Sequence, residues 1–259
     1  MAKKVGLALS GGGARGFAHV GVLKALVENN IPIDLIAGTS AGSFVGGAYA
    51  AGLSVDEIVE IGKKISWFGV AGFSYSPKGF LSNSAMKGFI EKSFPVTRFE
   101  NLRIPFTAVA CDLETGEEIY LKDQGDLTNA IRASCAIPGV FVPVIDDGRQ
   151  LVDGGVVSPI PTRAVKKMGA EVIIAVDLIT CGTTYWGSPT TLVGTLFQSA
   201  MIMLRTTSKH QHYRADVIIE PAISHIRPDE IARRDELIEL GYRSVVDSLD
   251  EIRKAVESN

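Results

Sequence analysis

The sequence predicts a three-layer α/β/α fold, in which helices cover both faces of a mostly parallel central sheet. Short apolar runs alternate with segments of helical periodicity, a pattern typical of parallel sheets covered on both sides. The chain has 259 residues and shows no repeat and no linker-like stretch. We therefore expect one domain over residues 1–259, completed by helices over 178–259.

The first third of the chain begins with an apolar run at 5–9, followed by glycines and by helical spacing as far as residue 30. A second buried strand is expected at 33–37. The next helix, at 40–51, carries small residues every four positions, and another helix follows at 55–65. Residues 66–80 are rich in glycine, serine and aromatic residues without a period, which predicts a mobile loop or flap.

The rest of the chain continues the alternation. Apolar runs predict strands at 106–111, 117–121, 140–144, 151–152, 172–176 and 217–219. Helical spacing predicts helices at 83–94, from 127 to before Pro138, and at 161–168, 192–204 and 234–256. An apolar stripe such as that of 192–204 is most often core, so we expect this helix to be buried.

Composition excludes several classes of function. The chain holds 26 Lys and Arg against 29 Asp and Glu, so no basic field exists to bind nucleic acid. The uncharged stretches 35–55 and 178–204 are interrupted by glycine or proline, so neither is expected to cross a bilayer. Glycines interrupt the first apolar run before a signal-peptide core is complete. The three cysteines lack metal-site or disulfide spacing, which favours the cytoplasm: Cys111, Cys135 and Cys181.

The sharpest local motif is Gly38-Thr39-Ser40-Ala41-Gly42, between a predicted strand and a predicted helix. A serine on such a turn is held exposed at the carboxyl end of a strand, and the flanking glycines Gly38 and Gly42 avoid contact with neighbouring backbone. The following helix N-terminus favours negative charge there. Ser40 is therefore a candidate nucleophile, and a packing turn without catalytic role is the alternative.

A glycine loop, Ser10-Gly11-Gly12-Gly13-Ala14-Arg15-Gly16, precedes the first helix. Its bare amides suit the oxyanion of an acyl-transfer intermediate. Phosphate binding is the rival, since Gly11, Gly13 and Gly16 match the G-x-G-x-x-G spacing. No Gly-Lys-Ser/Thr follows, which excludes a P-loop. With the serine turn next along the chain, we favour an oxyanion hole.

A nucleophilic serine needs a base within hydrogen-bond reach. Asp153-Gly154-Gly155 follows a short apolar strand, and two glycines bare the backbone around this carboxylate. Burial would raise its affinity for a proton, although Asp-Gly turns are also common without such a role. The histidines are predicted to lie in a helix, at a polar helix end or in a loop. None has a glycine turn or the end of a strand beside it: His19, His210, His212 and His225.

These three motifs, in this order, resemble the patatin-like phospholipase family. Residues 133–144, Ala-Ser-Cys-Ala-Ile-Pro-Gly-Val-Phe-Val-Pro-Val, are similar to the family segment before its catalytic aspartate, and 169–177 to its closing strand. The resemblance covers about residues 5–177, two thirds of the chain. It implies lipid acyl-ester hydrolysis by a Ser/Asp dyad without a catalytic histidine.

Carried over by position, Ser40 is the nucleophile, Asp153 the base within Asp153-Gly154-Gly155, and the Gly11 to Gly13 amides form the oxyanion hole. Arg15 orders that loop or adds positive potential. We expect no cofactor and no metal, and a substrate such as phospholipid or lysophospholipid. An α/β-hydrolase with a Ser/Asp/His triad, or an adaptor that keeps the fold, remains open. Peripheral membrane contact is expected through the 66–80 flap rather than the 192–204 helix.

Overall fold

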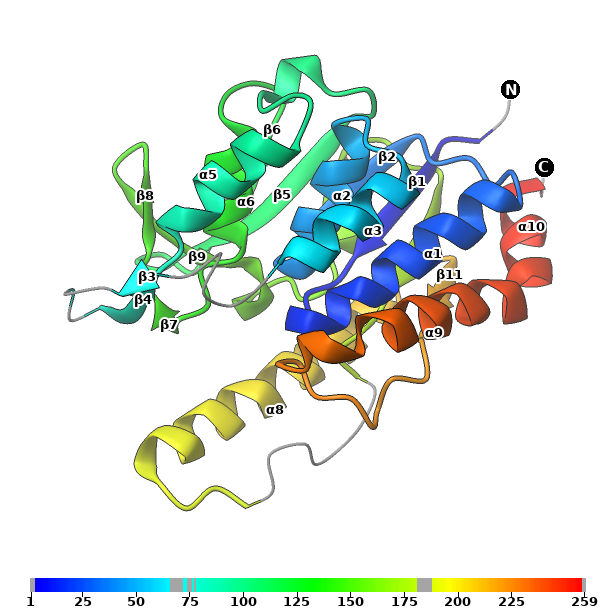
Figure 1. The fold of residues 1–259 in the computed structure, drawn as a ribbon. Coiled ribbons are helices and arrows are strands. Elements are labelled where there is room, and N and C mark those ends of the chain that lie inside the picture. The colour runs from blue at the N-terminus through cyan, green and yellow to red at the C-terminus, as the bar shows by residue number, and fades with distance from the viewer. Residues whose placement is uncertain (1–2, 66–71, 74–75, 77, 181–187, 258–259) are drawn as a thin grey trace.

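A computed structural model describes residues 3–65, 72–73, 76, 78–180 and 188–257. Its central sheet has eight strands in the order β11-β10-β1-β2-β5-β9-β8, and β6 pairs with β5 beside this path (Figure 1). Neighbours from β11 to β5 are parallel, whereas β6, β9 and β8 join by antiparallel pairing. In that spatial order the strands are Val217–Ile219, Val172–Val176, Val5–Leu9, Leu35–Thr39, Phe106–Asp112, Arg149–Asp153 and Val144–Asp146, with β6 at Glu118–Lys122.

Alternate residues of the parallel strands enter two separate cores, because successive side chains of a strand point to opposite faces. On β1, Leu7 and Leu9 belong to a large core beneath helices, whereas Ala8 belongs to a smaller core on the other face. On β10, Ile174 and Ile173 divide in the same way. Helices thus pack on both faces, and the predicted three-layer α/β/α fold is confirmed.

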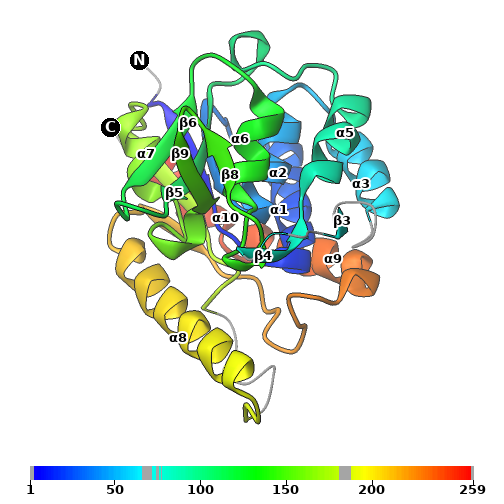
Figure 2. The ribbon, with the colours of Figure 1, turned by 90° about the vertical axis from the view of Figure 1, so that its left-hand side faces the viewer.

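The larger core lies under α1, α2, α3, α5, α6, α9 and α10, and the smaller one under α7 (Figure 2). Ser54 caps the N-terminus of α3 through a reciprocal pair of hydrogen bonds with Glu57. This capping explains why α3 begins at Val55. The bounds are α1 Phe17–Glu28, α2 Ala41–Ala50, α3 Val55–Lys64, α5 Ser84–Ser93, α6 Leu127–Ser134, α7 Thr162–Lys167, α8 Leu192–His212, α9 Arg234–Asp247 and α10 Leu249–Glu257, with 3-10 turns at Gly13–Gly16, Phe99–Asn101, Gly154–Val156 and Ile231–Arg233.

Two predicted segments have a different secondary structure from the one expected. Within the predicted loop 66–80, residues 66–71, 74–75 and 77 lie outside the described residues, but β3 (Gly72–Phe73) and β4 (Gly79–Ser82) pair with each other. β4 also pairs with β7 (Gly139–Phe141), which forms a second, three-stranded sheet. The prediction of one helix at 234–256 is also wrong, since α9 ends before Ser248 and α10 begins after it.

The largest difference concerns α8. The predicted 192–204 helix continues to His212, and Ser208 is its single buried residue. In Figures 1 and 2, α8 stands away from the body and lies on the side where β1 and β2 end. The expectation that this helix is core is therefore wrong. Among the helices that the structure describes, none combines the length and apolar content that crossing a bilayer requires.

Candidate active site

Ser40 occupies a strained turn between β2 and α2. Its φ is 53° and its ψ is −121°, a conformation that non-glycine residues adopt only where the surrounding structure enforces it. Close packing on both sides provides that enforcement: a Cβ on Gly38 would lie 2.4 Å from the Gly42 carbonyl oxygen, and one on Gly42 would lie 2.2 Å from the Leu9 carbonyl oxygen. Both glycines of the motif are thus required by the turn itself.

Hydrogen bonds fix Ser40 from both ends of the turn. The Ser40 amide donates to Ser134 Oγ over 2.9 Å, and Ser134 Oγ donates in turn to the Val109 carbonyl oxygen over 2.6 Å. On the helix side, the Ser43 amide and hydroxyl both donate to the Ser40 carbonyl oxygen, at 2.8 and 2.7 Å. Sequence reasoning missed Ser134 as a positioning residue, because its partners lie 25 and 94 residues away.

Asp153 reaches the same level of the sheet through the register of β5, which lies between β2 and β9. Thr39 of β2 is opposite Val109, and Asp153 of β9 is opposite the next residue, Ala110. Burial raises the pKa of the Asp153 carboxyl to about 6, while hydrogen bonds from the Ser40 side chain and the Gly155 amide act in the opposite direction. The Gly155 amide donates to Asp153 Oδ1 over 2.7 Å, so one carboxylate oxygen is held by the backbone.

The glycine loop lies against the serine turn. A Cβ on Gly11 would lie 3.5 Å from Ser40 Cβ, and one on Gly16 would lie 2.6 Å from Ala41 Cβ. The Gly11 amide donates to the Pro159 carbonyl oxygen over 3.1 Å. The amides of Gly12 and Gly13 have no hydrogen-bond acceptor among the residues that the structure describes. The Gly11 amide, predicted to be an oxyanion donor, thus already has an acceptor in the protein, and the amides of Gly12 and Gly13 are the two of the three that stay available to a ligand.

Arg15 lies beneath this loop and is 1% exposed. Its Nε donates to the Ile226 carbonyl oxygen over 2.7 Å and its Nη1 to the Leu178 carbonyl oxygen over 3.1 Å. A guanidinium with carbonyl partners holds backbone segments together. The sequence leaves two roles open for Arg15, ordering the glycine loop or adding positive potential. These contacts favour the first.

An apolar pocket opens at Ser40 and runs between α1, α2, α3 and α5. Its wall includes Ser40, the loop residues Gly13 and Ala14, and Cys135. The remaining lining is almost wholly hydrocarbon: Phe17, Val20, Phe44, Val45, Ile58, Ile65, Met86, Ile137, Phe141 and Ile231. Such a pocket suits an acyl chain better than a charged group.

The four histidines, all in the described residues, have positions unlike that of a triad base. His19 Nε2 donates to the Ser10 carbonyl oxygen, and burial lowers the pKa of His19 to about 4. His212 pairs with Asp177 and His225 with Glu236, while His210 is exposed near the end of α8. Asp153 is therefore the base candidate beside Ser40.

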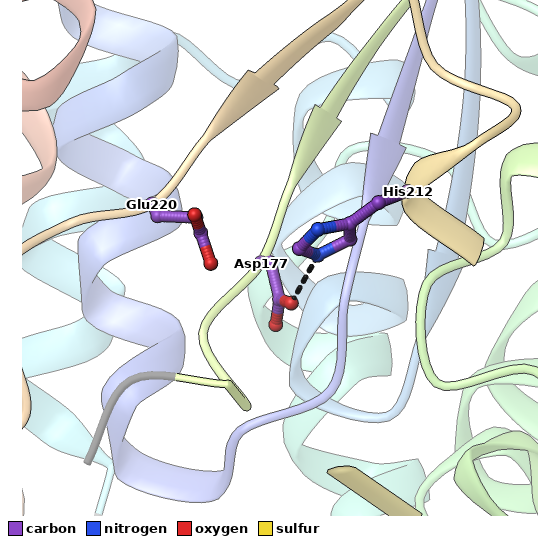
Figure 3. Close-up of side chains that lie close together, drawn as sticks. All are labelled: Asp177, His212 and Glu220. Atoms are coloured by element: carbon purple, nitrogen blue, oxygen red, sulfur yellow. Dashed lines mark hydrogen bonds and ion pairs between the residues drawn. The ribbon is translucent and has the colours of Figure 1, made fainter. Parts of the chain in front are cut away.

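Among the described residues, one group could hold a metal ion: Asp177, His212 and Glu220 offer ligand atoms within 4.8 Å of one another (Figure 3). These side chains already have protein partners. His212 Nε2 lies 2.7 Å from Asp177 Oδ2, and Glu220 accepts from the Thr180 hydroxyl over 2.6 Å. The sequence alone does not predict this cluster, because its residues are distant in sequence. They lie at the end of β10, at the end of α8 and directly after β11.

Comparison with known proteins places this geometry in a family. A family model described as Patatin-like phospholipase matches residues 7–166, which include Ser40, Asp153 and the glycine loop. The chain belongs to the patatin-like phospholipase family. The Mycobacterium tuberculosis protein "Uncharacterized NTE family protein Rv1063c" is 41% identical over 178 residues, which cover 68% of this chain and 49% of that protein. "Lysophospholipase NTE1" of Pyricularia oryzae is 29% identical over 282 residues, covering 97% of this chain and 19% of its own.

A protein of known structure has a similar fold. VipD from Legionella pneumophila has a TM-score of 0.58 at 14% identity, with 96% of this chain and 67% of that chain covered. At that identity the likeness concerns the fold alone. This patatin-like chain spans about half the length of its mycobacterial relative and about a fifth of the fungal one.

Proposed function

We propose that this patatin-like protein hydrolyses acyl esters of lipids, such as phospholipid or lysophospholipid, with Ser40 as nucleophile and Asp153 as base. The observation that carries the proposal is Asp153: a buried carboxyl whose pKa is raised to about 6 by burial, and on which the Ser40 side chain acts in the opposite direction. A carboxylate with that pKa is still mostly ionised near neutral pH, and it accepts a proton far more readily than an ordinary aspartate.

In the proposed reaction, Ser40 Oγ attacks the ester carbonyl carbon while its proton passes to Asp153. The carbonyl oxygen becomes an oxyanion, and the amides of Gly12 and Gly13 donate to it together with the positive end of α2. Collapse of this intermediate breaks the bond to the alcohol, which takes the proton from Asp153. Water, deprotonated by Asp153, then hydrolyses the acyl-enzyme by the same steps.

The apolar pocket supplies the binding energy for the acyl chain. Because most of its large lining residues come from helices that pack on the sheet, the pocket is formed before substrate arrives, which lowers the entropy lost on binding. The name of the fungal relative, a lysophospholipase, agrees with such a substrate. A cytoplasmic location remains a prediction from the cysteines.

Labelling with a fluorophosphonate probe and hydrolysis of a short-chain ester test this proposal. Ser40→Ala should abolish both, and Asp153→Asn should reduce turnover by about a thousandfold or more, as loss of a proton acceptor does in a catalytic triad. Ser244→Ala is the matched control, since the Ser244 hydroxyl donates only to the Gly241 carbonyl oxygen within α9. Near-wild-type turnover by folded Ser40→Ala protein would refute the assignment.

A further inference from the structure

Helix α8 carries large apolar side chains that the body of the protein does not cover. The exposed fractions are 77% for Leu192, 65% for Val193, 63% for Leu196 and 70% for Met203. At about 100° per residue, these side chains lie in one half of the helix circumference, together with Phe197 and Leu204. We call this set of six residues the α8 apolar arc.

The base of α8 is fixed to the body by polar contacts. Ser208 Oγ donates to Asp177 Oδ2 over 2.9 Å, and His212 Nε2 lies 2.7 Å from the same oxygen (Figure 3). Gln211 Oε1 accepts from the Ile160 amide over 2.7 Å. These hydrogen bonds fix the direction in which α8 leaves the body, although the outer half of α8 has few contacts with the body.

The apolar arc begins beside the candidate active site. Leu204 is its innermost member, and a Cβ on Gly155 would lie 3.4 Å from Leu204 Cδ1. Gly155 is the residue whose amide holds the Asp153 carboxylate. From Leu204 outward to Leu192 the helix holds no charged residue, so the apolar arc runs from the neighbourhood of Asp153 to the outer end of α8.

Charge along this segment has the opposite sign to that of the whole chain. From Leu178 to Ala215 there is no Asp or Glu, while Arg205, Lys209 and Arg214 are present. The chain as a whole has a formal net charge of −3. On α8, Arg205 and Lys209 occupy positions on the half of the helix opposite to most of the apolar arc; Lys209 is exposed and Arg205 partly buried. A helix with an apolar arc on one side and cations on the opposite, polar side is typical of helices that lie in the head-group region of a membrane.

We propose that the α8 apolar arc inserts into the surface of a bilayer that carries anionic lipid, and so holds the pocket mouth against its substrate. This inference rests on the proposed lipid-ester hydrolysis. Large exposed apolar side chains gathered on one side of a helix are typical of a surface that another molecule covers. The position of the arc near Asp153 and the cations on the opposite side of the same helix favour lipid over a second copy of the chain.

Vesicle flotation tests this proposal in the Ser40→Ala background, where no lipid is consumed. Vesicles of phosphatidylcholine alone and of phosphatidylcholine mixed with phosphatidylglycerol should bind the protein, the mixed ones more tightly and in a salt-dependent manner. Leu196→Ser with Met203→Ser should weaken the partition coefficient by about tenfold or more for each side chain removed from lipid. The matched control is Val27→Ser with Val246→Ser, which are 45% and 44% exposed on α1 and α9.

Hydrolysis of a water-soluble short-chain ester, measured with active Ser40 protein, separates this inference from the proposed function. The α8 double variant should keep that activity, because neither residue lines the pocket, and lose activity on vesicle lipid. Equal vesicle binding by the α8 and control variants would overturn the inference. A second outcome would also overturn it: the wild type is a dimer, and the α8 double variant is a monomer that binds vesicles as well as the wild type does. The apolar arc would then be covered by a second copy of the chain and not by lipid.

Discussion

Asp153→Asn should reduce turnover by about a thousandfold or more and at the same time make the protein more stable than the wild type at alkaline pH. The pKa of Asp153 is about 6 in the folded protein against 3.8 for an ordinary aspartate. Below pH 3.8 both states hold the proton, so its contribution to stability is fully present there. Between the two values the folded state holds more protons than the unfolded state, so stability is lost as pH rises through about 6.

The full loss is about 3 kcal/mol, since one pKa unit corresponds to about 1.4 kcal/mol. Roughly half of it falls between about pH 5 and pH 8, where the wild type is easiest to study. Asparagine has the same shape as aspartate, keeps the acceptor for the Gly155 amide and does not ionise. The free energy of unfolding of Asp153→Asn relative to wild type should therefore rise by about 1.4 kcal/mol over that range.

Urea denaturation followed by circular dichroism at several pH values measures this difference. Asp177→Asn is the control of opposite sign. Burial acts to raise the pKa of Asp177, but hydrogen bonds from His212, the Ile179 amide, Thr180 and Ser208 outweigh it and hold the pKa below its usual value. The contribution of Asp177 is thus present at high pH and lost in acid. A stability difference for Asp153→Asn that does not change between about pH 5 and pH 8 would refute the reasoning.

Three further perturbations test other parts of the site. The acid limb of kcat/KM on a soluble ester should have a midpoint near pH 6, because protonated Asp153 cannot accept the Ser40 proton; a midpoint near pH 4 would contradict this. Gly42→Ala should cost at least about 3 kcal/mol in a denaturation assay, since its Cβ would lie 2.2 Å from the Leu9 carbonyl oxygen, whereas Gly88→Ala, with open space around it, should be neutral or stabilising. Ser134→Ala should cost about 1 to 3 kcal/mol and lower kcat more than it changes KM, because the Ser40 amide and the Val109 carbonyl lose their partner.

Local pattern predicted the elements that carry the site, because each is formed by neighbours in the chain. The runs at 5–9 and 172–176 are buried on both faces, as their apolar content indicates, and the glycines at 38 and 42 are required by a turn of only five residues. The second strand begins two residues later than expected, at Leu35. The first residue of β2 depends on which residues pair with β1. The apolar content of residues 33–37 does not indicate that pairing.

Long-range contacts account for what the sequence left undetermined. Periodicity along 192–204 indicates that one side of a helix is apolar, but not what covers it, and α8 is exposed. The β4–β7 pairing joins Gly79 to Gly139, and the Gly11 amide finds its acceptor at Pro159. Neither partner can be read from residues nearby. The roles of Gly12 and Gly13 as oxyanion donors, and of Ser40 and Asp153 as a dyad, stay predictions until activity is measured.

The packing of the glycine loop against the serine turn has a consequence for anyone who modifies this protein. Gly16 touches Ala41, Gly11 touches Ser40, and Gly42 lies on the Leu9 carbonyl, so the two segments share a single interlocked surface. A substitution tolerated in one segment depends on what occupies the other, and grafting either loop alone from a relative should fail where grafting both succeeds. Directed evolution of the substrate range should therefore randomise the two segments as one unit.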